Sequence, residues 1–178
     1  MRIVITGIPG TGKTLLAEKI AGNMNLLIVR IADIARESRL DRGNEHEVDI
    51  RKLAPKLEFL REREDYVVEG HLACELRLPS DVVVVLRTHP YVLRERLEKR
   101  GYKGEKLKEN LEAEMLDYCV QRVEQEYGAE PLELDTTNRL VDESARVLEE
   151  AIRQKKKKID SVNYSKELKE HLEPGGSK

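Results

Sequence analysis

The segment from Gly7 to Thr14 reads GIPGTGKT and matches the phosphate-binding pattern G-x-x-x-x-G-K-[ST] at every defined position. It follows the β-branched run 2–6 and opens the helical pattern 13–24, which is the strand–loop–helix context that the motif requires. Glycines let the loop aim its backbone N–H groups inward, and the helix N-terminus adds positive potential. The segment therefore predicts a site for ATP or GTP on an α/β fold.

Four more short apolar runs follow along the chain, and helical patterns separate them. Continuous apolar strands that alternate with helices indicate a parallel sheet covered on both faces. We expect a three-layer α/β P-loop NTPase fold, in which a five-stranded parallel sheet carries its ligands at the carboxyl ends of the strands. The further strands are expected at 26–31, 66–69, 81–86 and 131–137, and the further helices at 47–63, 90–100 and 106–127.

Length, charge and cysteine content narrow the class of protein. The chain has 178 residues, which suits one domain with a core of its own. Its formal net charge of -2 gives no overall attraction to nucleic acid or to a membrane surface, and no segment resembles a membrane span. The two cysteines, Cys74 and Cys119, form no C-x-x-C pair, so we expect no zinc site and a reduced, cytoplasmic protein.

The predicted donor site combines the phosphate loop with cations from another segment. Lys13 can reach the β- and γ-phosphates of ATP, and the Thr14 hydroxyl can bind Mg²⁺. Arg96 and Arg100 are four residues apart, so they share one face of a helix. The ATP-binding residues that we expect are Gly10, Thr11, Gly12, Lys13, Thr14, Leu15, Arg96 and Arg100.

A second substrate pocket is indicated by the segment RIADIARES at 30–38. Asp33 can cap a short helix, and Arg36 then projects one turn later, where its guanidinium can fork onto the phosphate of an acceptor nucleotide. An exposed helix arginine without a binding role explains this segment equally well. Gly101 and Gly104 bracket a segment that contains lysine and suits a small lid, although a solvated charged helix has the same composition.

The stretch YVVEGHLAC at 66–74 is an apolar run that ends in polar residues. Glu69 stands where a nucleotide enzyme would have a carboxylate for the metal, so we expect it to orient the water ligands of Mg²⁺. His71 can position a water molecule or a phosphate, or it is a hydrogen-bonded structural residue just after the strand. Cys74 is expected to be a small buried apolar residue. The catalytic residues that we expect are Lys13, Arg100, Glu69 and His71.

Together these segments resemble the nucleoside-monophosphate kinases of the adenylate kinase superfamily. DIAR resembles the D-[ML]-x-R acceptor motif of that superfamily, and ELDTT is similar to its last strand and nucleotide-base loop. Arg96 and Arg100 fall where the superfamily has two arginines on the helix that enters the lid. A more specific resemblance is to the adenylate kinase isoenzyme 6 type, also called the coilin-interacting nuclear ATPase family. It is carried by TGIPGTGKT, DIARE, V-x-G-H-x-x-C and VLRTHPYVLRERLEKRGYKGEKLKENLEAE, and covers about residues 1–152.

The resemblance implies a kinase core at 1–154, with an acceptor-nucleotide region at 28–51 and a lid at 99–109, followed by a basic helical or mobile tail at 155–178. It implies a broad-specificity adenylate kinase that uses Mg²⁺ with ATP, accepts AMP and other nucleoside monophosphates, and also hydrolyses ATP. It further implies binding to a platform protein of the small ribosomal subunit and action late in the maturation of that subunit. The lysine run 155–158 would allow contact with rRNA, although such runs are usually solvated helix ends.

One position departs from the family pattern, because Glu69 replaces the usual Asp. The longer stem is tolerated better by a carboxylate that holds the water ligands of Mg²⁺ than by a direct ligand, so we expect activity to be retained. Two other functions stay open. One is an ATPase assembly factor or chaperone of a small-subunit ribosomal protein with little kinase role. The other is a kinase of a different small acceptor, of the shikimate or gluconate type, against which DIAR and the arginine pair argue.

Overall fold

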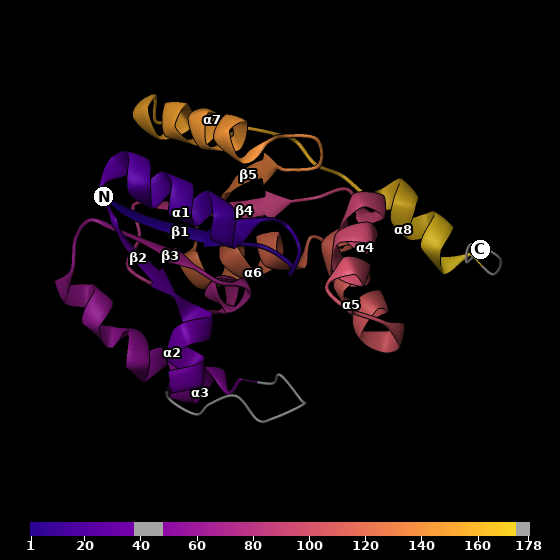
Figure 1. The fold of residues 1–178 in the computed structure, drawn as a ribbon, viewed down its shortest axis with the longest axis horizontal. Coiled ribbons are helices and arrows are strands. Elements are labelled where there is room, and N and C mark those ends of the chain that lie inside the picture. The colour runs from indigo at the N-terminus through magenta and orange to yellow at the C-terminus, as the bar shows by residue number, and fades with distance from the viewer. Residues whose placement is uncertain (38–47, 174–178) are drawn as a thin grey trace.

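The computed structural model describes residues 1–37 and 48–173, which form a three-layer α/β structure around one parallel sheet (Figure 1). The five strands stand in the order β2-β3-β1-β4-β5, and this confirms the expected fold class. The described elements are β1 (Arg2–Thr6), α1 (Lys13–Met24), β2 (Leu27–Arg30), α2 (Ile31–Glu37), α3 (Ile50–Leu53), the 3-10 helix η1 (Ala54–Glu62), β3 (Tyr66–Glu69), the 3-10 helix η2 (His71–Glu75), β4 (Val82–Arg87), α4 (Pro90–Lys99), α5 (Gly104–Met115), α6 (Tyr118–Tyr127), β5 (Leu132–Asp135), α7 (Val141–Arg153) and α8 (Ser165–Leu172).

Strand β1 lies at the centre of the sheet and sets where the other strands end. Ile5 of β1 lies opposite Glu69 of β3, and Thr6 lies opposite Val85 of β4. The chain passes from β1 to strands on one side of it and then returns to the other side with β4 and β5. Such a reversal leaves a crevice at the carboxyl ends of the central strands, where ligands of open α/β sheets bind.

Apolar side chains of alternating orientation bury both faces of the sheet. Ile5 and Leu86 pack against Leu16 of α1 and Leu148 of α7, and these two helices lie together on one side in Figure 1. The opposite face packs against two groups of elements, with α2, α3 and η1 at one end and α4, α5 and α6 at the other. Within the described ranges, no helix combines the length and apolar composition needed to cross a bilayer.

Two expected helices differ in the structure. The helix expected at 106–127 is wrong as a single element, because α5 ends at Met115 and α6 begins at Tyr118. Asp117 between them adopts a left-handed conformation with φ of 55°, which interrupts the helical hydrogen bonds. The helix expected at 47–63 begins outside the described residues and continues as α3 and then as the 3-10 helix η1, which has Pro55 in its first turn. A proline ring removes an N–H donor and so favours the change of geometry there.

A buried cluster of charges explains the break between α5 and α6. Arg87 at the end of β4 is 1% exposed, and its Nε donates to Glu114 Oε1 at 2.9 Å. Its other nitrogens donate to Asp117 and Glu133, and the ring of Tyr164 lies 5.3 Å from the guanidinium carbon. The left-handed turn at Asp117 and the contact of its carboxylate with Arg87 thus occur at the same residue. The cluster therefore joins β4, β5, the α5–α6 turn and the segment before α8.

The chain after α7 is attached to the rest of the molecule. Helix α8 docks against α4 and α5, where His171 Nε2 lies 3.1 Å from Glu112 Oε1 and His89 Nε2 lies 3.4 Å from Glu167 Oε1. Tyr164, just before α8, is buried against Arg87. Of the tail expected at 155–178, residues 165–172 are thus helical, and residues 174–178 lie outside the described part.

The charge cluster predicts a large stability effect for Glu114→Ala. The substitution leaves the guanidinium of Arg87 and the backbone N–H of Thr88 without the Oε1 acceptor that both now use. Breaking a buried ion pair from one side costs about 3–5 kcal/mol, so we expect Tm in thermal denaturation to fall by about 6–20 °C. Glu109→Ala, an exposed change on the same helix, is the control and should leave Tm nearly unchanged. Equal Tm values for the two variants would contradict a stabilising role of the cluster.

Candidate functional site

The loop between β1 and α1 needs glycine at two positions because other backbone and side chains crowd it. A Cβ on Gly7 would lie 2.6 Å from the carbonyl oxygen of Leu86 in β4. Gly10 has a φ of 93°, and a Cβ there would lie 2.9 Å from Leu93 of α4. The loop therefore runs close to both β4 and α4. This close packing fixes the direction in which its N–H groups point.

Internal hydrogen bonds hold the loop in shape. The buried Thr11 hydroxyl donates to the carbonyl of Ile8 at 2.9 Å. Lys13 Nζ donates to the carbonyls of Gly7 at 2.9 Å and Ile8 at 3.0 Å, so its ammonium lies across the loop. Burial lowers the pKa of Lys13. An anionic phosphate bound beside it would raise that pKa, so this ammonium is placed to favour a negative ligand.

Thr14 and Glu69 bring two oxygen ligands together beside the loop. The Thr14 hydroxyl donates to Glu69 Oε1 at 3.3 Å, and Glu69 is 6% exposed at the end of β3. Burial raises the pKa of Glu69, and the neighbouring Lys13 and the Thr14 hydroxyl oppose this shift. The described residues contain no group of three or more His, Cys, Asp or Glu side chains able to hold a metal ion. Hard oxygen donors in so small a number fit Mg²⁺, which is usually bound by one or two protein groups together with phosphates and water.

A cavity of about 480 Å³ opens between the loop, α2, the end of β3 and α5, and we call it the α2-side cavity. It brings together most of the expected catalytic and acceptor-site residues, which come from distant parts of the sequence. Four cations face it, so it suits an anionic ligand. Its lining residues are Pro9, Lys13, Thr14, Ile31, Ala32, Ala35, Arg36, Val48, Glu69, Gly70, His71, Leu72, Arg100, Tyr102, Lys106 and Asn110.

The acceptor motif at 33–36 differs from the expectation in the role of Asp33. Asp33 lies within the first turn of α2 rather than in front of the helix, so it is not the N-terminal cap. It accepts instead from Arg36 Nη1 at 3.2 Å, and it does not line the α2-side cavity. The Arg36 side chain is 73% exposed and lines the cavity. Asp33 thus contacts Arg36 rather than the cavity itself.

His71 has an unpaired imidazole in the described part of the chain. Its backbone carbonyl accepts from Thr6 Oγ1 at 3.1 Å and from Cys74 Sγ at 3.0 Å, whereas its ring makes no hydrogen bond to the residues described. Partial desolvation by the cavity walls, with the cations Lys13 and Lys106 nearby, lowers the pKa of His71. The ring is therefore neutral near pH 7 and faces the α2-side cavity. Among the residues described, none forms the hydrogen bond that a structural role of the His71 side chain would require. Cys74 is 1% exposed, as expected for a small buried residue.

A second cavity of about 250 Å³ lies on the other side of the loop, and we call it the β5-side cavity. Arg96 reaches it from α4, and its Nη2 donates to the carbonyls of Thr136 at 2.9 Å and Thr137 at 3.3 Å. Arg100, just past the end of α4, lines this cavity as well as the α2-side cavity. The lining residues are Gly10, Thr11, Gly12, Leu15, Leu16, Arg96, Arg100, Thr136, Arg139, Val141 and Ser144.

Several residues that line these cavities are not among the site residues expected from the sequence, and they include four with polar or charged side chains that face a ligand-sized space: Tyr102, Lys106, Asn110 and Arg139. Tyr102, Lys106 and Asn110 reach the α2-side cavity from α5 and the turn before it, and Lys106 Nζ lies 4.9 Å from the centre of the Tyr102 ring. The lysine content of this segment is visible in the sequence, but the side chains that line the cavity follow from the position of α5 (Gly104–Met115). Arg139 lines the β5-side cavity from the loop after β5. No local motif marks it.

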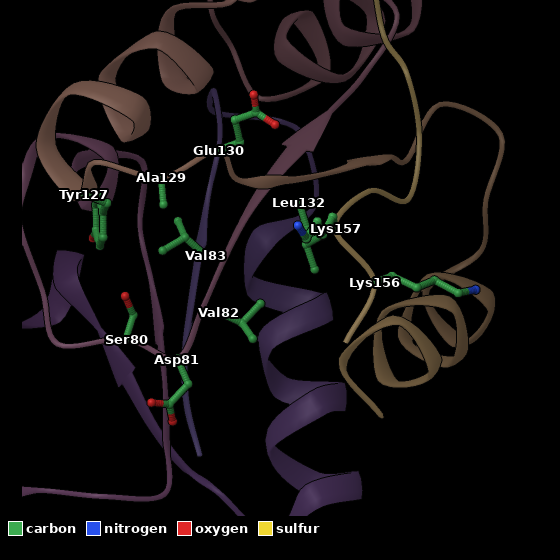
Figure 2. Close-up of a pocket in the computed structure, with 10 residues that line it drawn as sticks. All are labelled: Ser80, Asp81, Val82, Val83, Tyr127, Ala129, Glu130, Leu132, Lys156 and Lys157. Carbon is green, nitrogen blue, oxygen red and sulfur yellow. The ribbon is translucent and has the colours of Figure 1, made fainter. Parts of the chain in front are cut away.

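A further cavity of about 500 Å³ lies at the amino ends of β4 and β5, away from the loop (Figure 2). Two of its four charged side chains, Asp81 and Lys156, form ion pairs. Asp81 accepts from Arg2 Nη2 at 2.7 Å, and Lys156 Nζ lies 3.3 Å from Glu150 Oε1. Figure 2 shows the Lys156 side chain pointing away from the other lining residues. Apart from Asp33, the expected site residues line the two cavities beside the loop and not this one, so we assign the candidate site to those two cavities.

Comparisons with known proteins identify the family of the chain. A family model described as an AAA domain matches residues 3–117. A protein of Methanocaldococcus jannaschii with the name "Putative adenylate kinase" is 33% identical over 178 residues, covering 97% of each chain. Proteins of the same name from Pyrococcus furiosus and Methanothermobacter thermautotrophicus are 34% and 40% identical, covering 99% and 82% of this chain and 99% and 86% of theirs.

Solved structures share the fold at low identity. The structure of shikimate kinase from Acinetobacter baumannii in complex with shikimate has a TM-score of 0.67 at 18% identity, covering 87% of this chain and 94% of that one. Deoxyadenosine kinase from M. mycoides has a TM-score of 0.57 at 15% identity, covering 86% of this chain and 100% of that one. These likenesses establish a P-loop kinase fold. The chain therefore belongs to the AAA-domain family of P-loop proteins and to the family of these archaeal proteins named "Putative adenylate kinase".

Proposed function

We propose that the protein is a broad-specificity nucleoside-monophosphate kinase that converts ATP and AMP into two molecules of ADP. The observation that carries the proposal is that two cavities flank one phosphate loop and that Arg100 lines both. Transfer between two nucleotides needs two pockets whose phosphate ends meet near one cation. The names of the full-length archaeal relatives support the same reaction.

In this proposal the β5-side cavity and the loop hold the donor ATP. The backbone N–H groups of the loop, Lys13 and Thr14 bind the phosphates, and Arg96 lies along the base. Thr14 and Glu69 would hold Mg²⁺, Glu69 through the metal's water ligands, and the ion would neutralise the charge of the β- and γ-phosphates. The donor-binding residues that we propose are Gly10, Thr11, Gly12, Lys13, Thr14, Leu15, Arg96 and Arg100.

The α2-side cavity takes the acceptor. Arg36 binds the α-phosphate of AMP through a bidentate, charge-assisted contact, and Asp33 orients the Arg36 guanidinium through the hydrogen bond at 3.2 Å. Arg100 stabilises the charge that spreads over the transferring phosphoryl group. No covalent enzyme intermediate is required, because the chain positions the two phosphates and supplies positive charge.

We also propose ATP hydrolysis at the same site, on the basis of His71. Its neutral ring faces the α2-side cavity together with Lys13 and Glu69. A neutral imidazole can accept a proton from water, so a water molecule can replace AMP as the acceptor. Kinase and ATPase reactions would then share one donor site.

The resemblance to the isoenzyme 6 type adds a role that we propose on that likeness alone. In this role the protein is cytoplasmic and binds a platform protein of the small ribosomal subunit late in the maturation of that subunit. The lysines at 155–158 would contact rRNA. The buried free cysteines, Cys74 and Cys119, are compatible with a reducing compartment. Pull-down of ribosomal proteins with ATP, ADP and no nucleotide tests it. Binding that is the same in all three states would contradict an ATP-driven assembly role.

The kinase proposal is tested by ADP formation in a coupled assay with ATP, Mg²⁺ and a panel of acceptors. AMP should give the fastest acceptor-dependent ADP formation, and other nucleoside monophosphates should also react. Shikimate and gluconate serve as acceptors of other small-molecule kinases and should give none. Slow ATP hydrolysis without any acceptor dependence would contradict the kinase function and favour an ATPase.

Arg36→Ala should raise the KM for AMP and leave the KM for ATP nearly unchanged. Losing a charge-assisted hydrogen bond to the phosphate corresponds to an increase of about 10- to 100-fold. Arg61→Ala is a matched control, because Arg61 is also an exposed helical arginine paired three residues away, with Glu58, and lies in η1 outside the cavity. Initial rates at varied AMP measure both variants. An unchanged KM for AMP in Arg36→Ala would favour a different acceptor.

Glu69→Gln should weaken the apparent affinity for Mg²⁺ by about 10- to 100-fold, as for other groups that act through the ligands of a metal. The variant keeps the shape of the side chain and removes its charge. Glu69→Asp restores the residue that the family usually has and should retain metal-dependent turnover. Titration of AMP phosphorylation with Mg²⁺ measures the effect, and an identical titration curve for Glu69→Gln would exclude a role of this carboxylate in metal binding.

His71→Ala should separate the two reactions. Loss of a base for water should reduce acceptor-free ATP hydrolysis by about 100-fold or more. AMP phosphorylation needs no such base and should change far less. Both rates are measured on the same preparation, with ATP saturating. Equal losses in the two rates would show that His71 acts on the donor site rather than on water.

A further inference from the structure

The β5-side cavity is bordered by two arginines that the same loop holds in place. Arg96 Nη2 donates to the carbonyls of Thr136 and Thr137 at 2.9 Å and 3.3 Å. Arg139 Nη1 donates to the carbonyl of Asp135 at 3.2 Å. Both arginines line the cavity, with Leu15, Leu16 and Val141 as apolar neighbours. Planar cations beside apolar side chains form a surface suited to stacking against a nucleobase.

Arg139 has one more partner, which comes from the segment between α7 and α8. Its Nη2 donates to Asp160 Oδ1 at 2.9 Å, and its Nη1 donates to the other carboxylate oxygen. This two-point contact fixes the plane of the guanidinium as a single hydrogen bond would not. The pair is largely protected from water, since the side chains of Arg139 and Asp160 are 27% and 19% exposed.

Asp160 is itself fixed to the edge of the sheet. Its backbone N–H donates to the carbonyl of Glu133 at 3.2 Å, and its Oδ2 accepts from the backbone N–H of Asp135 at 2.9 Å. The segment that carries it passes along β5 from the amino end of that strand, where Lys157 and Leu132 both line the separate cavity of about 500 Å³ (Figure 2). Although burial raises the pKa of Asp160, hydrogen bonds from Arg139 and from the Asp135 N–H prevail and lower it. The carboxylate is therefore ionised when it holds Arg139.

We infer that Asp160 is a positioning residue of the donor-nucleotide site, which holds the guanidinium of Arg139 against the nucleobase and so makes the segment after α7 part of that site. This inference rests on the proposed function, because it takes the β5-side cavity as the place of the donor base. Asp160 lies beyond the residues 3–117 that the AAA-domain model matches. Stacking contacts the face of a base and not its hydrogen-bonding edge, so the contribution should be similar for ATP and GTP.

Equilibrium binding without an acceptor tests the inference. The probes are ATP, GTP and inorganic tripolyphosphate, which has the same phosphate chain and no base. For Asp160→Ala we expect the Kd of ATP and of GTP to rise about 5- to 30-fold, the range of a stacked cation, while the Kd of tripolyphosphate stays unchanged. Arg139→Ala should have the same effect, and the double variant should lose no more than either single one, because both changes remove one contact.

Asp81→Asn is the matched control. Asp81 also accepts two hydrogen bonds from one guanidinium, from Arg2 Nε at 3.2 Å and from Arg2 Nη2 at 2.7 Å. It accepts a third from the backbone N–H of Arg2 at 2.8 Å. This pair lies at the amino end of the sheet, so its loss should leave all three Kd values unchanged. Asp160→Glu keeps the carboxylate and should recover part of the ATP affinity.

The outcomes separate this inference from the kinase proposal. Unchanged ATP binding in Asp160→Ala overturns the inference, whatever the acceptor assay shows. Equal weakening of ATP and tripolyphosphate also overturns it, since that result means a distorted phosphate loop. A selective loss of ATP and GTP affinity supports it even if no acceptor is ever phosphorylated, in which case only the kinase proposal fails.

Discussion

The pairing of β1 with β3 and β4 is the interaction on which the candidate site depends. The register places Ile5 opposite Glu69, and the backbone N–H of Gly70 donates to the carbonyl of Ile5 at 3.2 Å. The phosphate loop leaves β1 one residue later, so backbone hydrogen bonds between the strands place the Glu69 carboxylate beside the loop, where it accepts from the Thr14 hydroxyl. Gly70 is constrained by the same geometry, since a Cβ there would lie 2.9 Å from Ile31 of α2. A slip of one residue would turn Glu69 to the other face of the sheet.

On the other side of β1, the charge cluster around Arg87 holds the ends of the strands and the segments after them in place. It anchors the end of β4, the α5–α6 turn, β5 and Tyr164 to a single guanidinium. Ions in a protein interior are tolerated only when most of their hydrogen-bonding capacity is used, and Arg87 satisfies this with three carboxylates. The cluster lies at the carboxyl end of β4, and Thr88 directly after it joins the threonines after β5, with Thr88 Oγ1 2.8 Å from Thr136 Oγ1. It thereby fixes the loop that holds Arg96 and Arg139, although none of its members lines either cavity.

The parts of this structure that sequence reasoning could predict are those with a local cause. The existence and order along the chain of the five strands and the phosphate loop follow from apolar runs and from glycines within a few residues, whereas the strands expected at 26–31 and 131–137 are shorter in the structure. The break at Asp117 was missed because it depends on Arg87, a residue 30 positions away, holding the Asp117 carboxylate. Arg139 and Asp160 were missed for the same reason, since their contact joins a loop to a segment 21 residues later that is positioned by β5. The capping role predicted for Asp33 required α2 to begin directly after it, whereas α2 begins at Ile31, two residues before Asp33.

Burial differs sharply between the two sides of the candidate site, and this difference has a physical consequence for the proposed reaction. Thr11, Lys13 and Glu69 are 0%, 9% and 6% exposed, so these three groups of the proposed donor side are already desolvated. Arg36, at 73% exposure, lies instead in water at the side of the α2-side cavity, and Arg100 and Lys106 are exposed as well. In water their charges are screened, and they gain strength only when a ligand and the surrounding segments exclude solvent. Under the proposed function, a bound acceptor nucleotide would therefore do more than fill a pocket, because it would bring these cations into the low-dielectric environment in which they can stabilise the transferring phosphoryl group.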